Sequence, residues 1–258
     1  MTITKTNIAN QALIALGELV ITDLDTDTTK RGTTLAALYE IKKKYLLRNF
    51  PWKFATKRAT LAEVEYKLLF DTETVDFVIG EVLSGAVGEG TVEYIVRDGT
   101  AGIYYLSDVT TGFVDDEAIT SDIAGVAVAN GVEVSMTPIN DYDNVFALPS
   151  DYVHLLEVNP TYVDYKVESN FILCSVADEL DIKYIYNVTD PDEFDPMFTE
   201  AFAALLARES AIQITDSMSK RKAMDEAFLD KLADARFSGS IEDPGDKLEA
   251  DEWLNSRI

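Results

Sequence analysis

The chain has 258 residues, a formal net charge of −24, 47% hydrophobic residues and 26% charged residues. These proportions of hydrophobic and charged residues are ordinary for a soluble globular protein, and the length suffices for a core in one or two domains. No apolar run reaches the roughly 18 residues that cross a bilayer. The first residues lack the basic and apolar regions of a signal peptide, so we expect folding in a cytoplasm.

The negative charge is distributed unevenly. Residues 1–70 carry 11 basic and 7 acidic side chains, residues 71–146 carry 1 and 15, and residues 147–258 carry 10 and 24. A sequence-reading nucleic-acid binder normally has a basic footprint. The acidity instead favours solubility and argues against non-specific adhesion to DNA.

The residue types that most often build metal centres and catalytic triads are scarce. Cys174 is the only cysteine and His154 the only histidine, so an intrachain disulfide is impossible and a His/Cys zinc site lacks ligands. A Ser-His-Asp triad would have to use His154, which lies in an alternating, strand-like run. We expect a structural role for His154 and a small core position for Cys174.

Two acidic clusters look like sites at first sight. The aspartates of residues 23–27 begin like a calcium loop, but Thr28 and Thr34 stand where that loop needs Gly and Glu. We therefore expect a capping linker there. Residues 115–117 could bind a cation or pair as acid and base, yet in so acidic a chain a solvated turn is the expectation. The sequence predicts no metal and no cofactor.

Four segments have helical periodicity. The first spans residues 6–17 and ends at a C-capping glycine. The second spans about residues 28–49 and is stopped by Pro51. The third and fourth span about residues 196–213 and 218–237. The expected apolar face of the second helix consists of Leu35, Leu38, Tyr39, Tyr45 and Leu46.

Residues 71–140 are rich in Val, Ile, Thr, Tyr and Gly, which predicts a compact β domain. They contain a weak repeat: Phe77-Val78-x-x-Glu81-x-Leu83-Ser84 recurs as Phe113-Val114-x-x-Glu117-x-Ile119-Thr120. We expect two related β units packed face to face.

Further short strands are predicted after residue 140. The fold class is therefore α+β: a helical bundle domain built from both chain ends, residues 1–70 plus 141–258, with β-strands and an inserted small β domain at 71–140. Insertions of this kind succeed at exposed loop tips.

Two blocks of sequence resemble a known family. The first is Asn10-x-Ala-Leu-x-x-Leu-Gly17, followed by Leu46-Leu-Arg-Asn-Phe-Pro-Trp-Lys-Phe-Ala55; the second includes Phe146-Ala-Leu-Pro-Ser-Asp-Tyr152, Phe194-Asp-Pro-x-Phe198 and Asp251-x-Trp-Leu-x-x-Arg257. In this order they resemble the tail tubular protein A family, the head-to-tail adaptor of short-tailed bacteriophages. The resemblance covers about residues 5–62 and 145–258. It implies a helical bundle with a β domain, a ring of twelve subunits beneath the portal, and no catalytic residues.

The one concentration of basic side chains spans the last turns of the predicted second helix and the segment after it. It contains Lys42, Lys43, Lys44, Arg48, Lys53, Lys57 and Arg58. A solvated helix face, a docking surface for an acidic patch on a neighbour, and a DNA contact are all open readings.

Aromatic residues mark two further positions. Trp52, between Phe50 and Phe54, is expected to anchor the core. Trp253 lies near the end of the chain, beside Leu254 and Arg257, and either docks on a partner or packs on its own subunit.

We expect a structural virion protein, a ring-forming head-to-tail connector with no enzymatic activity. Its partners would be the portal, the tail tubular or nozzle proteins and further copies of itself in a ring of twelve. It would surround DNA without reading its sequence and would not contact a membrane. It would be assembled in the bacterial host cytoplasm and lie at the head–tail junction. The alternatives are a cell-wall hydrolase and a glycan-binding decoration of the virion.

Overall fold

The computed structural model describes residues 2–136, 142–161, 163–176 and 179–241. It confirms a mixed α+β chain. The chain divides into two compact units: residues 1–55 together with 187–258, here called unit 1, and residues 56–186, here called unit 2.

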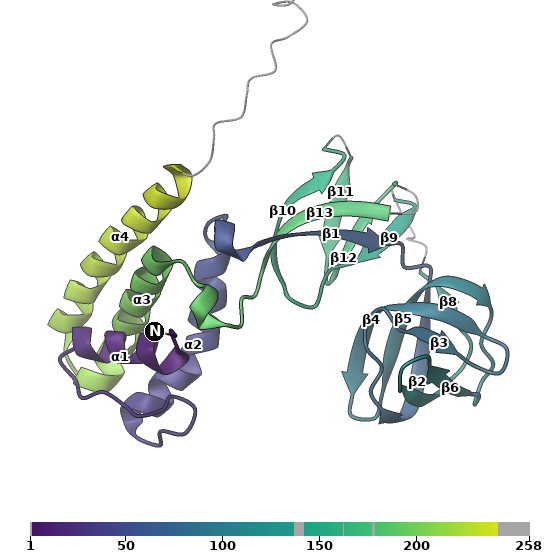
Figure 1. Ribbon diagram of the computed structural model, residues 1–258, viewed down its shortest axis with the longest axis horizontal. Coiled ribbons are helices and arrows are strands. Elements are labelled where there is room, and N and C mark those ends of the chain that lie inside the picture. Colours follow the sequence, from purple (N-terminus) through teal and green to yellow (C-terminus); the bar gives the residue numbers. More distant parts are fainter. Residues whose placement is uncertain (1, 137–141, 162, 177–178, 242–258) are drawn as a thin grey trace, which may run out of the picture. The chain divides into compact units, whose positions relative to one another are not determined.

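Unit 1 contains the four long helices. They are α1 (Lys5–Ala15), α2 (Lys30–Arg48), α3 (Pro196–Thr215) and α4 (Met218–Ile241), with short 3-10 turns η1 (Lys53–Ala55) and η2 (Pro191–Glu193). Helix α3 packs against each of the other three and lies between α2 and α4 (Figure 1). It is apolar nearly all round, as expected of a helix at the centre of its unit. Its fully buried side chains include Phe198, Phe202, Leu205 and Leu206.

Local capping explains where these helices begin and end. Gly17 has a φ of 71°, and the amide of Glu18 donates to the carbonyl of Leu13 at 2.9 Å, so α1 ends at the glycine that the sequence predicts. Asp195 accepts from the amides of the first turn of α3, next to Pro196 at its first position. The hydroxyl of Ser217 accepts from the amide of Lys220, the third residue of α4, at 3.3 Å and so caps this helix.

Aromatic side chains fill the core of unit 1. Trp52 is 3% exposed, and its indole N–H donates to the carbonyl of Leu46 at 2.9 Å. Its ring meets Phe198 edge to face with centroids 5.0 Å apart, and Phe54 meets the same phenylalanine at 4.9 Å. Such contacts stabilise beyond the apolar area that they bury. The expected anchoring role of Trp52 is therefore confirmed.

Unit 2 is built from antiparallel strands in three sheets. Two are three-stranded, in the orders β1-β13-β10 and β11-β12-β9, and the third has seven strands in the order β5-β4-β3-β6-β7-β2-β8. Because β2 also pairs with β5, six of those strands form a closed ring. The strands are β1 (Thr56–Ala62), β2 (Tyr66–Val75), β3 (Val82–Ser84), β4 (Glu89–Asp98), β5 (Ala101–Thr111), β6 (Ala118–Ser121), β7 (Val126–Ala129), β8 (Val134–Ser135), β9 (Asn144–Ala147), β10 (Tyr152–Asn159), β11 (Tyr165–Glu168), β12 (Phe171–Cys174) and β13 (Glu179–Tyr186).

The division of the chain differs from the expected one of 1–70 plus 141–258 against 71–140. Strand β1 pairs along its whole length with β13, from Thr56 opposite Ile185 to Ala62 opposite Glu179. These strands therefore belong to unit 2 and not to the helical part. The seven-stranded sheet begins with β2, before residue 71, and ends with β8, before residue 140.

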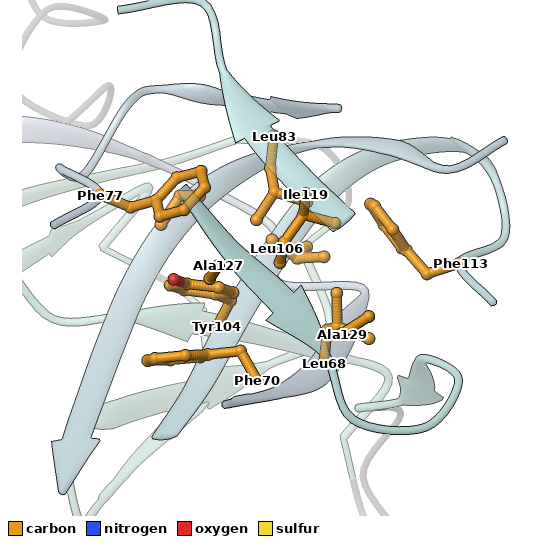
Figure 2. Packing of buried hydrophobic residues seen from close by; sticks show 11 residues of the cluster. Leu68, Phe70, Phe77, Leu83, Tyr104, Leu106, Phe113, Ile119, Ala127 and Ala129 are labelled. Carbon is orange, nitrogen blue, oxygen red and sulfur yellow. The ribbon is translucent and has the colours of Figure 1, made fainter. Parts of the chain in front are cut away.

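The closed sheet surrounds an apolar core, drawn in Figure 2. Phe70 and Tyr104 stack with centroids 3.9 Å apart and planes at 12°. Next to Tyr104 of this core, the carboxylate of Glu73 is 6% exposed. It accepts from Arg97 Nε at 2.7 Å and from the Tyr104 hydroxyl at 2.9 Å. A buried carboxylate is stable only with such partners.

The repeat is real, but its packing differs from the expected face-to-face arrangement. The two copies lie side by side in one sheet, because β3 pairs with β6 through Leu83 opposite Ser121 and Ser84 opposite Thr120. Their two phenylalanines, Phe77 and Phe113, are both 2% exposed. Side-by-side pairing lets the backbone N–H and C=O groups of the two copies bond to each other.

Candidate assembly surface

The four basic residues of α2 that the sequence singles out do not form one exposed surface. Lys43 is 1% exposed, and its ammonium lies 2.7 Å from Glu40 Oε2. Lys42 Nζ lies 2.8 Å from Glu209 Oε2 on α3. Lysine stems pack along apolar surface while their charges find partners, which explains how two of the four are used inside unit 1. Lys43 is therefore too buried to contact a neighbour, whereas Lys42, whose side chain is 23% exposed, stays a candidate for docking.

The other two basic residues share an exposed face with apolar side chains. Lys44 and Arg48 are exposed, Ile41 is 65% exposed and Tyr45 is 51% exposed. Their spacing of three, four and seven residues places them on one stripe of the helix. We call these four residues the α2 face. The expectation that Tyr45 belongs to the apolar core face of this helix was wrong. Its side chain is exposed on the same side of α2 as Ile41, whereas Tyr39 and Leu46 are buried.

A chain of ion pairs holds the three helices behind the α2 face. Glu209 accepts from Lys42 and, at 2.7 Å, from Arg208, whose guanidinium lies 3.3 Å from Asp225 on α4. The same guanidinium lies over the ring of Phe228. Burial alone would raise the pKa of Glu209, but the hydrogen bonds from the two cations outweigh it and hold that pKa below its usual range.

The remaining basic residues of the predicted cluster lie elsewhere. Lys57 and Arg58 are in β1, in unit 2. Lys57 lies 2.8 Å from Asp151 Oδ2, with its ammonium over the ring of Tyr186. Lys53 is in η1 and exposed. The terminal candidates Trp253, Leu254 and Arg257 lie outside the described residues.

The other candidates that the sequence suggested are Cys174, His154 and the aspartate-rich linker before α2. Cys174 is fully buried, and burial raises the pKa of its thiol. His154 is half-buried in β10. Asp27 accepts from the hydroxyl and, at 2.7 Å, the amide of Thr29 before α2, and these bonds lower its pKa. The hydroxyl of Thr29 accepts from the amide of Gly32 and caps α2, so the linker caps the helix as predicted.

Among the residues that the structure describes, no group of three or more His, Cys, Asp or Glu side chains could hold a metal ion. Within the same residues, no helix is long and apolar enough to cross a membrane.

Comparisons with known proteins leave the family open. No protein-family model matches the chain, and no curated protein matches its sequence.

Proposed function

We propose that this chain is a structural subunit of a ring that joins the head portal to the tail of a short-tailed bacteriophage. One side of the ring would bind the portal and the other the tail proteins, with about twelve copies around the DNA channel, a closed cyclic assembly. Unit 1 would be the helical bundle of the adaptor, built from both chain ends. The terminal residues Trp253, Leu254 and Arg257 remain candidates for docking on the portal.

The observation that carries the proposal is the α2 face. Ile41 and Tyr45 are large apolar side chains turned away from the core, and they alternate along α2 with two exposed cations, Lys44 and Arg48. Tyrosine and arginine are enriched where proteins bind proteins, and a central apolar contact with a charged rim is the usual anatomy of such a surface. The ion pairs of Lys42 and Glu209 hold α2 against α3, so this face is preorganised.

The net charge supports a DNA channel rather than a DNA-binding protein. At −24 per subunit, an assembled ring would be strongly acidic. An acidic wall repels phosphate and lets a duplex slide, whereas a basic wall retains it through counterion release.

The rival reading as a cell-wall hydrolase requires a carboxylic acid with a raised pKa. Glu40, Glu73, Glu209 and Asp27 are the described carboxyl groups whose pKa values are shifted, and all four shifts are downward. Each of these groups accepts hydrogen bonds in its charged form. This supports a structural role over an acid–base role.

The proposal is tested by mixing the full-length protein with purified portal and weighing the complexes by native mass spectrometry. We expect the wild type to bind as a ring, and the double variant Ile41→Asp/Tyr45→Asp to stay unassembled while its helical circular dichroism is retained. The matched control is Val78→Asp/Ile123→Asp, which changes residues 60% and 75% exposed in unit 2 and should assemble. Assembly of the α2 variant at wild-type affinity would remove the observation on which the proposal stands.

The two rivals have their own assays on the intact chain. Release of soluble fragments from purified bacterial cell wall would favour the hydrolase. Saturable binding on a glycan array, with no binding to portal, would favour the decoration protein.

A further inference from the structure

Helix α4 has a second exposed apolar stripe in unit 1. Leu229 is 56% exposed and Phe237 is 69% exposed, with the exposed Ala233 midway between them. A spacing of four residues places all three on one side of the helix. Phe228, Leu232 and Ala235 are the buried side chains of this part of α4.

The charges beside this stripe are acidic. From Ala223 to Phe237 the exposed charged side chains of α4 are Asp225, Glu226, Asp230 and Asp234. The two basic residues in this range are half-buried and used within unit 1. Lys231 lies 2.5 Å from Glu200, and Arg236 donates to the carbonyl of Asn49 at 3.4 Å. We call Glu226, Leu229, Asp230, Ala233 and Phe237 the α4 face.

The α2 face and the α4 face complement each other. Each pairs two large apolar side chains with charges, basic on α2 and acidic on α4. Opposite charges around an apolar centre favour the matching partner and its register, and like charges disfavour α2 against α2 or α4 against α4. Both faces are exposed in one subunit, and α3 lies between the two helices, so the faces do not cover each other within a copy.

We infer that the α2 face of one copy binds the α4 face of the next. Two different patches on one subunit make a heterologous contact, and a heterologous contact closes into a ring when its rotation allows it. The occupant of both faces is thus a second copy of this chain. The inference rests on the proposed function for the ring itself, but it assigns the surfaces independently of the portal.

Complementing variants test this pairing. A chain with Ile41→Asp/Tyr45→Asp keeps only the α4 face, and one with Leu229→Asp/Phe237→Asp keeps only the α2 face. In sedimentation velocity at high concentration, neither variant should associate with itself. In a mixture, the two variants should form a heterodimer at least about tenfold more tightly than either binds itself. Self-association of either variant would mean that the contact is isologous and would overturn the pairing.

Cross-linking tests the same pairing in the intact assembly. Because Cys174 is fully buried, single cysteines can be added cleanly at Lys44 and at Asp230. A short bismaleimide should link Lys44→Cys chains to Asp230→Cys chains in a mixture, with or without portal, and should not link either variant to itself. The control is Gln213→Cys on α3, an exposed position that should not link to Lys44→Cys.

The outcomes separate this inference from the proposed function. If the wild type forms a ring on the portal but no Lys44–Asp230 link forms there, the pairing is wrong and the proposed function stands. If the link forms between free subunits while the wild type never binds portal, the pairing stands and the proposed function is wrong.

Discussion

Phe77 packs its ring over Gly125, where a Cβ would lie 2.5 Å from Phe77 Cγ. The second copy of the repeat does the same, because the ring of Phe113 covers Gly88. Each copy thus supplies a phenylalanine to the glycine of the other, and the two copies are interlocked within one closed sheet.

We predict that Gly125→Ala destabilises the protein by about 1–3 kcal/mol, because an added methyl overpacks a filled core. Gly88→Ala should have a similar cost. The matched control is Gly239→Ala in α4, where a Cβ would meet Phe50 at an ordinary 3.4 Å and alanine favours the helix. Urea unfolding measures all three variants. Equal stability of Gly125→Ala and the wild type would contradict the interlocked packing.

The carboxylate of Glu73 should also carry part of the stability of the closed sheet. It accepts from Arg97, from Tyr104 and from the amide of Phe77 at 3.1 Å. Replacing it by Gln weakens these charge-assisted bonds, and we predict a loss of about 1–3 kcal/mol. Asp98→Asn, at an exposed position in β4, is the control and should leave the unfolding midpoint nearly unchanged.

The same residue predicts a pH dependence. Burial opposes the charge of Glu73, but the hydrogen bonds from Arg97, Phe77 and Tyr104 prevail, so its pKa in the folded state is lowered. Its contribution is therefore fully present above the unfolded pKa and is lost as the pH falls through the lower pKa of the folded state. The stability difference between wild type and Glu73→Gln should shrink on acidification. A difference that stays constant down to pH 3 would show that the charge plays no part.

Two neighbouring lysines of α2 should differ sharply in their effect on folding. Lys43→Glu places a carboxylate in a buried position beside Glu40, and we predict a loss of about 2–4 kcal/mol in unfolding free energy. Lys44→Glu, at an exposed position, should change it by less than about 0.5 kcal/mol. Thermal melts followed by circular dichroism compare the two. Equal effects would mean that Lys43 is not buried in solution.

We further predict negligible binding of duplex DNA by the free subunit at physiological salt, because the chain as a whole repels phosphate. Fluorescence anisotropy with a labelled duplex measures this directly, with Lys44→Glu as the comparison. Salt-sensitive micromolar binding that Lys44→Glu abolishes would make the α2 face a DNA contact.

The sequence predicted the elements whose signals are local. The cap at Gly17 and the stop at Pro51 depend on neighbouring backbone groups, and the four helices lie close to their expected ranges. Trp52 was recognised as a core anchor because three aromatic residues crowd one short segment. The α+β class followed from the change in periodicity.

What the sequence did not predict depends on distant partners. The segment after Trp52 becomes β1 because β13, over a hundred residues later, supplies its hydrogen bonds. Tyr45 was placed in the core from its residue type, whereas its direction on α2 exposes it. Lys42 forms an ion pair with Glu209 of α3, and no residue near Lys42 in the sequence indicates that partner.

Native mass spectrometry of the full-length protein with purified portal distinguishes the proposed ring subunit, held through the α2 face, from any other assembly. We predict a complex with about twelve copies per portal, the closed cyclic assembly that a head-to-tail contact allows, and its loss in Ile41→Asp/Tyr45→Asp. If the wild type instead forms a stable two-fold dimer that does not bind the portal, the proposed ring subunit is ruled out.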